Sequence, residues 1–155
     1  MSTITNNVAG FLSTVAIPVR LAATTESGWP VVVSLWYLVE DEKLYCATRQ
    51  SAKIVTHLQN DSRCAFEVAA DIPPYCGVRG QAEAAIDQER GAEILERLLI
   101  RYLGGTTSSL AQNLLSYRAE EVAIVIQPVN LFTWNFTERM RDSIEQSGIE
   151  KPCPR

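Results

Sequence analysis

The chain has 155 residues and a mass of 17.2 kDa, the length of one domain that can bury a substantial core. Hydrophobic residues make up 46% of it and charged residues 21%, which excludes disorder along the whole chain. The formal net charge of −4 argues against nucleic acid as a partner, because binding to a phosphate backbone needs a basic face. The single histidine, His57, rules out most His-rich metal sites, and we expect no bound metal.

The four cysteines form no CxxC pair and no zinc-ligand spacing: Cys46, Cys64, Cys76 and Cys153. Three of them fall in apolar segments, where a reduced cysteine behaves as a small hydrophobic residue. We therefore expect structural, reduced cysteines and a cytoplasmic protein. Residues 1–20 lack a basic region before their apolar stretch, which is unlike a signal peptide, and no apolar run approaches the 18 residues of a membrane span.

The first half of the chain reads mainly as strands. A short strand over 20–25 and a turn containing Gly28 lead to residues 31–39, whose nearly continuous apolar sequence predicts a strand buried on both faces. A polar turn joins it to a strand over 44–48, and so short a link requires an antiparallel pair. A helical pattern then opens at Ser51 and stops at Asn60-Asp61.

In the second half, two alternating segments and two helical patterns follow in order, over residues 63–69, 78–86, 88–103 and 108–117. A buried strand over 122–126 is expected to close at Pro128, and a last strand places Phe132, Trp134 and Phe136 on one face. This succession of antiparallel strands with peripheral helices predicts a mainly β (α+β) fold built as a small Greek-key barrel. An α+β sandwich is the alternative.

The segment 48–53 carries the strongest chemical signal. Thr48 and Ser51 supply hydroxyl groups and Arg49 and Lys53 supply positive charge, at the point where a strand passes into a helix. Free N–H groups at a helix N-terminus favour a phosphate or carboxylate, which the cations would neutralise. The alternative is that Ser51 only caps the helix and that both cations are solvated.

Other candidates are weaker. Trp36 and Trp134 could stack on a flat ligand, although tryptophans in strands more often belong to the core. Ser34 is the one hydroxyl in the apolar run and could bond to the edge of a ring. His57 is better explained as surface or helix packing than as a catalytic base. Motifs of hydrolases, dinucleotide-binding folds and phosphate-binding loops are absent from the sequence.

Several segments, in order, resemble the FMN-binding split barrels of the pyridoxamine 5′-phosphate oxidase-like superfamily. They are the Gly28-Trp29-Pro30 turn with VVVSLWYLV after it, the run from Thr48 through Ser51 and Lys53 to Asn60-Asp61, the strand GVRGQAEA, and a closing strand in which Pro128 precedes Trp134 by six residues. Together they cover roughly residues 12–136.

The resemblance implies a six- to seven-stranded antiparallel Greek-key split β-barrel with peripheral helices. The FMN-binding domain would span 1–137, followed by a polar C-terminal tail over 138–155. It also implies a homodimer with the flavin at the subunit interface. The phosphate would be held by Thr48, Arg49, Ser51 and Lys53, the ring would lie along Val33, Ser34, Leu35 and Trp36, and Trp134 would complete the site.

The chain also departs from that family. Arg139-Met140-Arg141-Asp142 only partly matches the substrate-binding segment of true pyridoxamine phosphate oxidases, so that substrate is not assigned. No catalytic residue is identified. We expect a flavin-dependent oxidoreductase acting on a small molecule, with NAD(P)H as a possible electron donor. The alternatives are a non-catalytic flavin-binding or sensing protein, an F420-dependent reductase of the same fold, and a plain dimeric barrel with a vacant groove. Haem-binding relatives exist, but one histidine weakens that case.

Overall fold

The computed structural model describes residues 4–142 and Cys153. Its centre is a seven-stranded antiparallel sheet in the order β2-β1-β5-β6-β7-β4-β3. The strands are β1 (Val19–Thr24), β2 (Pro30–Leu35), β3 (Leu38–Glu40), β4 (Lys43–Arg49), β5 (Arg63–Ala69), β6 (Cys76–Asp87) and β7 (Glu121–Asn135). The helices are α1 (Asn6–Thr14), α2 (Lys53–Asn60), α3 (Gly91–Leu103) and α4 (Ser109–Ser116), with a short 3₁₀ turn over Arg118–Glu120.

The sheet curls because its two edge strands are consecutive in the chain. Strands β2 and β3 stand at opposite ends of the strand order, yet only Trp36 and Tyr37 separate them. So short a connection brings the two edges together, and the barrel is completed by the chain rather than by a full hydrogen-bonded ladder. The mainly β barrel with peripheral helices is confirmed.

This kink overturns the prediction of one doubly buried strand over residues 31–39. The run breaks at Trp36-Tyr37, and alternate side chains of β2 face outward, with Val32 65% exposed. The reason is that β2 covers the core with one face only, whereas Tyr37 turns inward, is fully buried and donates a hydrogen bond to the carbonyl of Leu12 at 2.8 Å.

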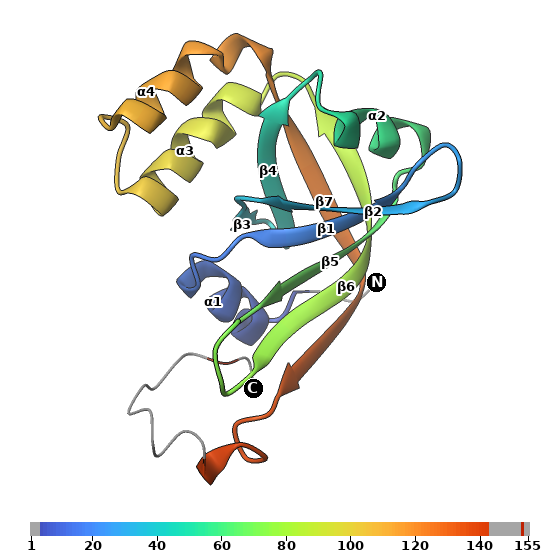
Figure 1. The fold of residues 1–155 in the computed structure, drawn as a ribbon, viewed down its shortest axis with the longest axis vertical. Helices are drawn as coiled ribbons and strands as arrows, with labels where there is room; N and C mark the ends of the chain where they lie inside the picture. Colours follow the sequence, from blue (N-terminus) through green and yellow to red (C-terminus); the bar gives the residue numbers. More distant parts are fainter. Residues whose placement is uncertain (1–3, 143–152, 154–155) are drawn as a thin grey trace.

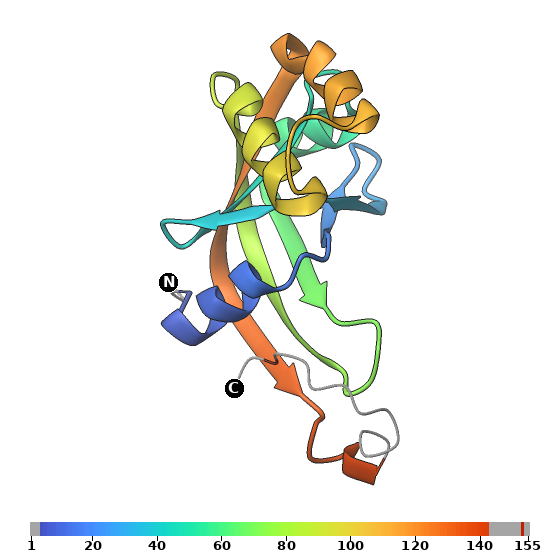
Figure 2. The same ribbon diagram turned by 90° about the vertical axis from the view of Figure 1, so that its left-hand side faces the viewer.

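The helices lie at different ends of the barrel. Figures 1 and 2 show α3 and α4 side by side next to the end of β4, with α2 at the same end and α1 lower, near β3. Strands β6 and β7 run on together beyond the other strands toward the opposite end. Helix α1, capped by the Thr5 side chain, is not among the elements predicted from the sequence.

Strand β7 contains a bulge that changes which of its residues face the core. Val122, Ile124 and Ile126 point inward and are at most 2% exposed. Ala82 pairs with Pro128 but Gln81 pairs with Asn130, so Val129 is an extra residue. The prediction that Pro128 closes the strand is therefore wrong. Because proline has no N–H to donate, it is accommodated at the bulge and the strand continues for seven more residues.

After the bulge, the aromatic residues of β7 face outward. Phe132 is 55% exposed, and it stands on the outer surface beside Arg79, its partner across the ladder. Trp134 is on the same surface, with the Arg79 guanidinium 5.4 Å from its ring centre. The far part of β7 therefore offers aromatic side chains to the outside of the barrel, while the near part builds the core.

A disulfide joins Cys76 to Cys153 with a Cα–Cα distance of 5.7 Å. The expectation that all four cysteines are reduced is therefore wrong for this pair, because the end of the chain returns to the start of β6. Cys46 and Cys64 are free and buried. Apart from Cys153, the predicted tail beyond residue 142 lies outside the described residues.

Candidate functional site

A cavity of about 350 Å³ opens between strands β2 and β4 and the α3–α4 pair. Its walls come from the end of β2 and the Trp36 kink, the end of β4, the two helices and the start of β7: Ser34, Leu35, Trp36, Ala47, Thr48, Arg49, Leu95, Leu114 and Glu121. Five of the nine residues predicted to bind a cofactor therefore line one cavity, although they come from segments more than ten residues apart in the sequence.

The strand ends bring the polar groups to the cavity. Arg49 ends β4, and it stands opposite Glu121, the first residue of β7, in the antiparallel ladder. The Arg49 guanidinium lies over the ring of Tyr117, 4.0 Å from the ring centre. This contact holds the exposed guanidinium at the cavity edge without neutralising it, because the tyrosine ring carries no net charge.

Trp36 forms the aromatic part of the wall. Its indole stacks on the ring of Tyr102 from α3, with ring centres 5.1 Å apart and planes 9° from parallel. The Tyr102 hydroxyl donates to the carbonyl of Ile17 at 3.1 Å. Contact with α3 therefore fixes the orientation of the Trp36 ring. A site for a flat ligand needs such an oriented aromatic wall.

Ser51 and Lys53 follow Arg49 in the chain but do not line this cavity. Ser51 lines an adjoining hollow with Gln50, Ala119 and Glu120, and Lys53 is the exposed first residue of α2. The alternative that Ser51 only caps the helix does not hold, because Ala52 is the N-cap residue and no side chain caps α2. No hydrogen bond therefore joins the Ser51 side chain to the N-terminus of α2, and both are available to a ligand.

The remaining two predicted residues are placed differently. Val33 packs against the core, so only its backbone could face a ligand of the cavity. Trp134 pairs with Gly77, whereas Thr48 pairs with Val122, twelve residues earlier in β7. At about 3.3 Å per residue this is about 40 Å along the strand, so Trp134 and the cavity of the same chain are far apart.

Glu121 is a charged residue of the cavity that was not predicted from the sequence. Burial of its carboxyl raises the pKa, and the charge of Arg49 partly opposes that shift. The sequence contained a signal, since a charged residue directly before the buried strand over 122–126 must lie at that strand's edge. Leu95 and Leu114 were missed for another reason: their helical pattern shows that they are buried, but not against which surface.

The described residues contain no group of three or more potential metal-binding side chains. None of their helices is long and apolar enough to cross a membrane. No family model matches the sequence, and no curated protein does.

Solved structures, by contrast, share its fold. The conserved hypothetical protein Rv2991 from Mycobacterium tuberculosis aligns over 97% of this chain and 90% of its own, with a TM-score of 0.72 and 19% identity. An F420 reductase aligns over 79% of this chain and 94% of its own (TM-score 0.63, 23% identity). A putative pyridoxamine 5′-phosphate oxidase from Listeria innocua covers 83% of this chain and 95% of its own (TM-score 0.61, 13% identity). The chain therefore has the split-barrel fold of pyridoxamine 5′-phosphate oxidase-like proteins.

Proposed function

We propose that this protein binds FMN in the β2–β4 cavity as a homodimer and acts as a flavin-dependent oxidoreductase on a small molecule. The observation that carries the proposal is the convergence of Ser34, Trp36, Thr48 and Arg49 on one cavity, next to the uncapped N-terminus of α2. Likeness in fold to an F420 reductase and to a putative pyridoxamine 5′-phosphate oxidase supports a flavin-type cofactor.

The residues present suit such a cofactor. A phosphate needs hydroxyl and N–H donors with positive charge, which Thr48, Ser51, Arg49 and Lys53 would supply. A flat ring needs an oriented aromatic or apolar wall, which Trp36 and Leu35 would supply. The bound flavin would supply the hydride or electron transfer, while the protein binds and orients it. The cavity of one chain is small for a cofactor of this size, in keeping with a site shared between subunits.

The first prediction concerns the phosphate. Replacing Lys53 with alanine is expected to weaken FMN binding about 10- to 100-fold, because one charge-assisted contact is lost. Flavin fluorescence titration measures the change. Lys43→Ala is the matched control, since Lys43 begins β4 and lies at its other end. Equal affinity of the Lys53 and Lys43 variants would contradict the phosphate site.

Glu121 provides a variant of opposite sign. Its carboxylate, when ionised, repels an anion held by Arg49, so Glu121→Gln should tighten FMN binding while keeping the side chain's shape.

Titration of the wild-type protein with F420, in parallel with FMN, decides between the two cofactors. Steady-state oxidation of NAD(P)H by the flavin-loaded protein, with varied acceptors, then separates an oxidoreductase from a flavin-binding or sensing protein.

The second prediction concerns the dimer. A groove of about 460 Å³ crosses the outer face of β1, β2, β5, β6 and β7, and Val32 and Phe132 are exposed in it. A row of three charged residues crosses the adjacent strands β1, β5 and β6 on this face. Their charges alternate in sign: Arg20, Glu67 and Arg79. Such a face suits a second copy of the same surface, because each charge can meet its opposite.

Phe132→Glu is therefore expected to convert the dimer to a monomer by burying a charge at the interface. Sedimentation equilibrium measures the mass, and FMN affinity should fall with it if Trp134 of the partner subunit completes the site. Ile100→Glu is the control, because Ile100 is equally exposed but lies on α3 outside the groove. A Phe132→Glu variant that stays dimeric would overturn this assignment.

A further inference from the structure

The Cys76–Cys153 disulfide attaches the end of the chain to the sheet. Cys76 is the first residue of β6, and Cys153 lies 77 residues later and packs against the main core. The two sulfur-bearing residues differ in access: Cys76 is 0% exposed, whereas Cys153 is partly exposed. Of the two cysteines, Cys153 is therefore the one that an external thiol can approach.

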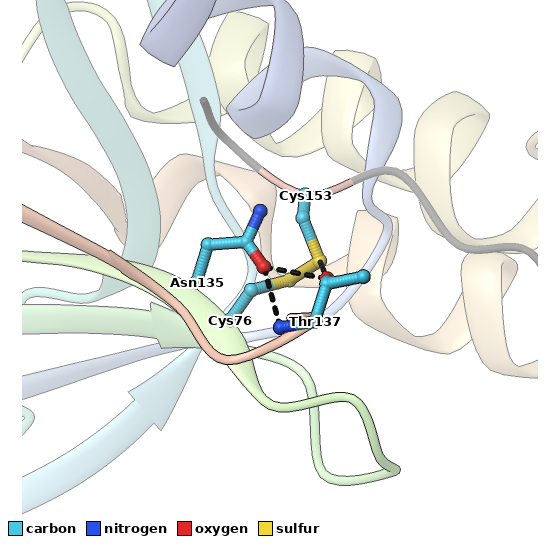
Figure 3. The surroundings of a disulfide bond; sticks show 4 residues. All are labelled: Cys76, Asn135, Thr137 and Cys153. Atoms are coloured by element: carbon cyan, nitrogen blue, oxygen red, sulfur yellow. Dashed lines mark hydrogen bonds between the residues drawn. A yellow bond between two sulfur atoms is a disulfide. The ribbon is translucent and has the colours of Figure 1, made fainter. Parts of the chain in front are cut away.

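The groups around the bond fix where Cys153 sits (Figure 3). Asn135, opposite Cys76 in the ladder, accepts hydrogen bonds from the backbone N–H and the hydroxyl of Thr137, at 2.9 and 2.5 Å. The Thr137 hydroxyl in turn lies 4.0 Å from the Cys153 sulfur. The bond joins the start of β6 to the end of the chain, and the Thr137 contact brings the turn after β7 next to it.

The disulfide is one residue away from Trp134. A Cβ on Gly77 would lie 2.7 Å from Cζ2 of the Trp134 indole, so the ring packs directly on the glycine backbone. Gly77 follows Cys76 in β6 and pairs with Trp134 across the ladder. A change in the backbone at Cys76 therefore reaches the indole through Gly77 alone.

We propose that the Cys76–Cys153 bond is a thiol–disulfide exchange site, reduced by an external dithiol, and that its state controls the packing of Trp134. A thiolate of the dithiol attacks Cys153 Sγ, and Cys76 leaves as the thiolate and takes up a proton. The second thiol of the reductant then displaces Cys153, which gives two cysteine thiols and one oxidised dithiol. This inference does not depend on the proposed flavin site.

The reductant has to come from outside the chain. Cys46 and Cys64 are the two free cysteines among the described residues, and both are buried. Burial raises the pKa of the Cys46 thiol well above its usual range and that of Cys64 to about 12, so neither is a thiolate near neutral pH. Exchange within the chain is therefore not supported by these thiols.

The test uses the full-length oxidised protein and dithiothreitol. Under denaturing conditions two thiols per chain should react before reduction and four after it, since the chain has four cysteines. Alkylation of the folded, reduced protein, followed by peptide mapping, should label Cys153 and leave Cys76 unlabelled until the protein unfolds. Four thiols before reduction, or a bond reduced only on unfolding, would overturn the proposal.

Tryptophan fluorescence tests the link to Trp134. Dithiothreitol should change the emission of the wild-type protein, and Cys153→Ser should reproduce the reduced spectrum and no longer respond. Cys64→Ser is the control and should keep the response. Trp134→Phe should abolish the change, since the other two tryptophans lie elsewhere: Trp29 in the turn between β1 and β2, and Trp36 in the link between β2 and β3. A response that persists in Trp134→Phe would overturn the control of Trp134 by the disulfide.

Discussion

Replacing Gly91 with alanine is expected to lower the free energy of unfolding by about 3 kcal/mol, the upper range for a side chain forced into a packed site. A Cβ at Gly91 would lie 2.0 Å from the carbonyl oxygen of Glu121 and 2.5 Å from the backbone nitrogen of Val122. These are backbone atoms of β7, so the first turn of α3 would have to move away from the sheet. Urea unfolding measures the loss.

The Gly91 substitution also tests the candidate site. Because Glu121 lines the cavity and α3 carries Leu95 on its wall, a displaced α3 should weaken FMN binding as well. Gly10→Ala in α1 is the control: a Cβ there has no neighbour within 4 Å, and alanine favours a helix by up to about 1 kcal/mol over glycine. Two variants of equal stability would contradict the close approach of α3 to β7.

Replacing Arg101 with methionine is expected to cost about 3 kcal/mol and to loosen α1 in particular. The Arg101 guanidinium on α3 donates to the carbonyls of Leu12, Ser13 and Val15 at 2.7–2.9 Å, at the end of α1. These carbonyls lie where a helix has no further N–H groups to offer them. Methionine keeps an unbranched, largely apolar stem but is shorter than arginine and donates nothing.

Hydrogen exchange distinguishes this effect from a general loss of stability. The amides of α1 should exchange much faster in Arg101→Met, while those of β6 and β7 should change only by the global loss. In Arg101→Lys, the exchange rates of the α1 amides should lie between those of the wild type and of Arg101→Met, because an ammonium group can reach fewer of the three carbonyls. Unchanged protection of α1 would show that Arg101 does not hold this helix.

Much of the barrel could be predicted from local pattern. Strand β5 spans the residues that alternation indicates, and α3 and α4 begin and end within three residues of their predicted limits. Each of these segments has a single hydrophobic periodicity and clear residues at which the strand or helix ends. The run 31–39 failed because its apolar sequence fits both one buried strand and two strands joined by a kink, and only the closing of the barrel decides between them.

The candidate site was predicted in part for a similar reason. Thr48 and Arg49 are recognisable because hydroxyls and cations at the end of a strand have a local chemical meaning. Glu121 depends on the pairing of β4 with β7, a contact between residues about seventy positions apart, which no local pattern contains. The Cys76–Cys153 bond was missed for the same reason, since nothing in the spacing of the four cysteines indicates a pair.

The bulge at Val129 limits the deletions and insertions that β7 can accept. One added residue lets the first half of β7 serve the interior of its own subunit and the second half present Phe132 and Trp134 to the outside. Deleting that residue would exchange the two faces beyond it, turning Leu131 outward and both aromatic rings toward the core. The length of this strand is thus under a stricter constraint than its composition: many side chains could be exchanged, but the number of residues between Ile126 and Phe132 could not.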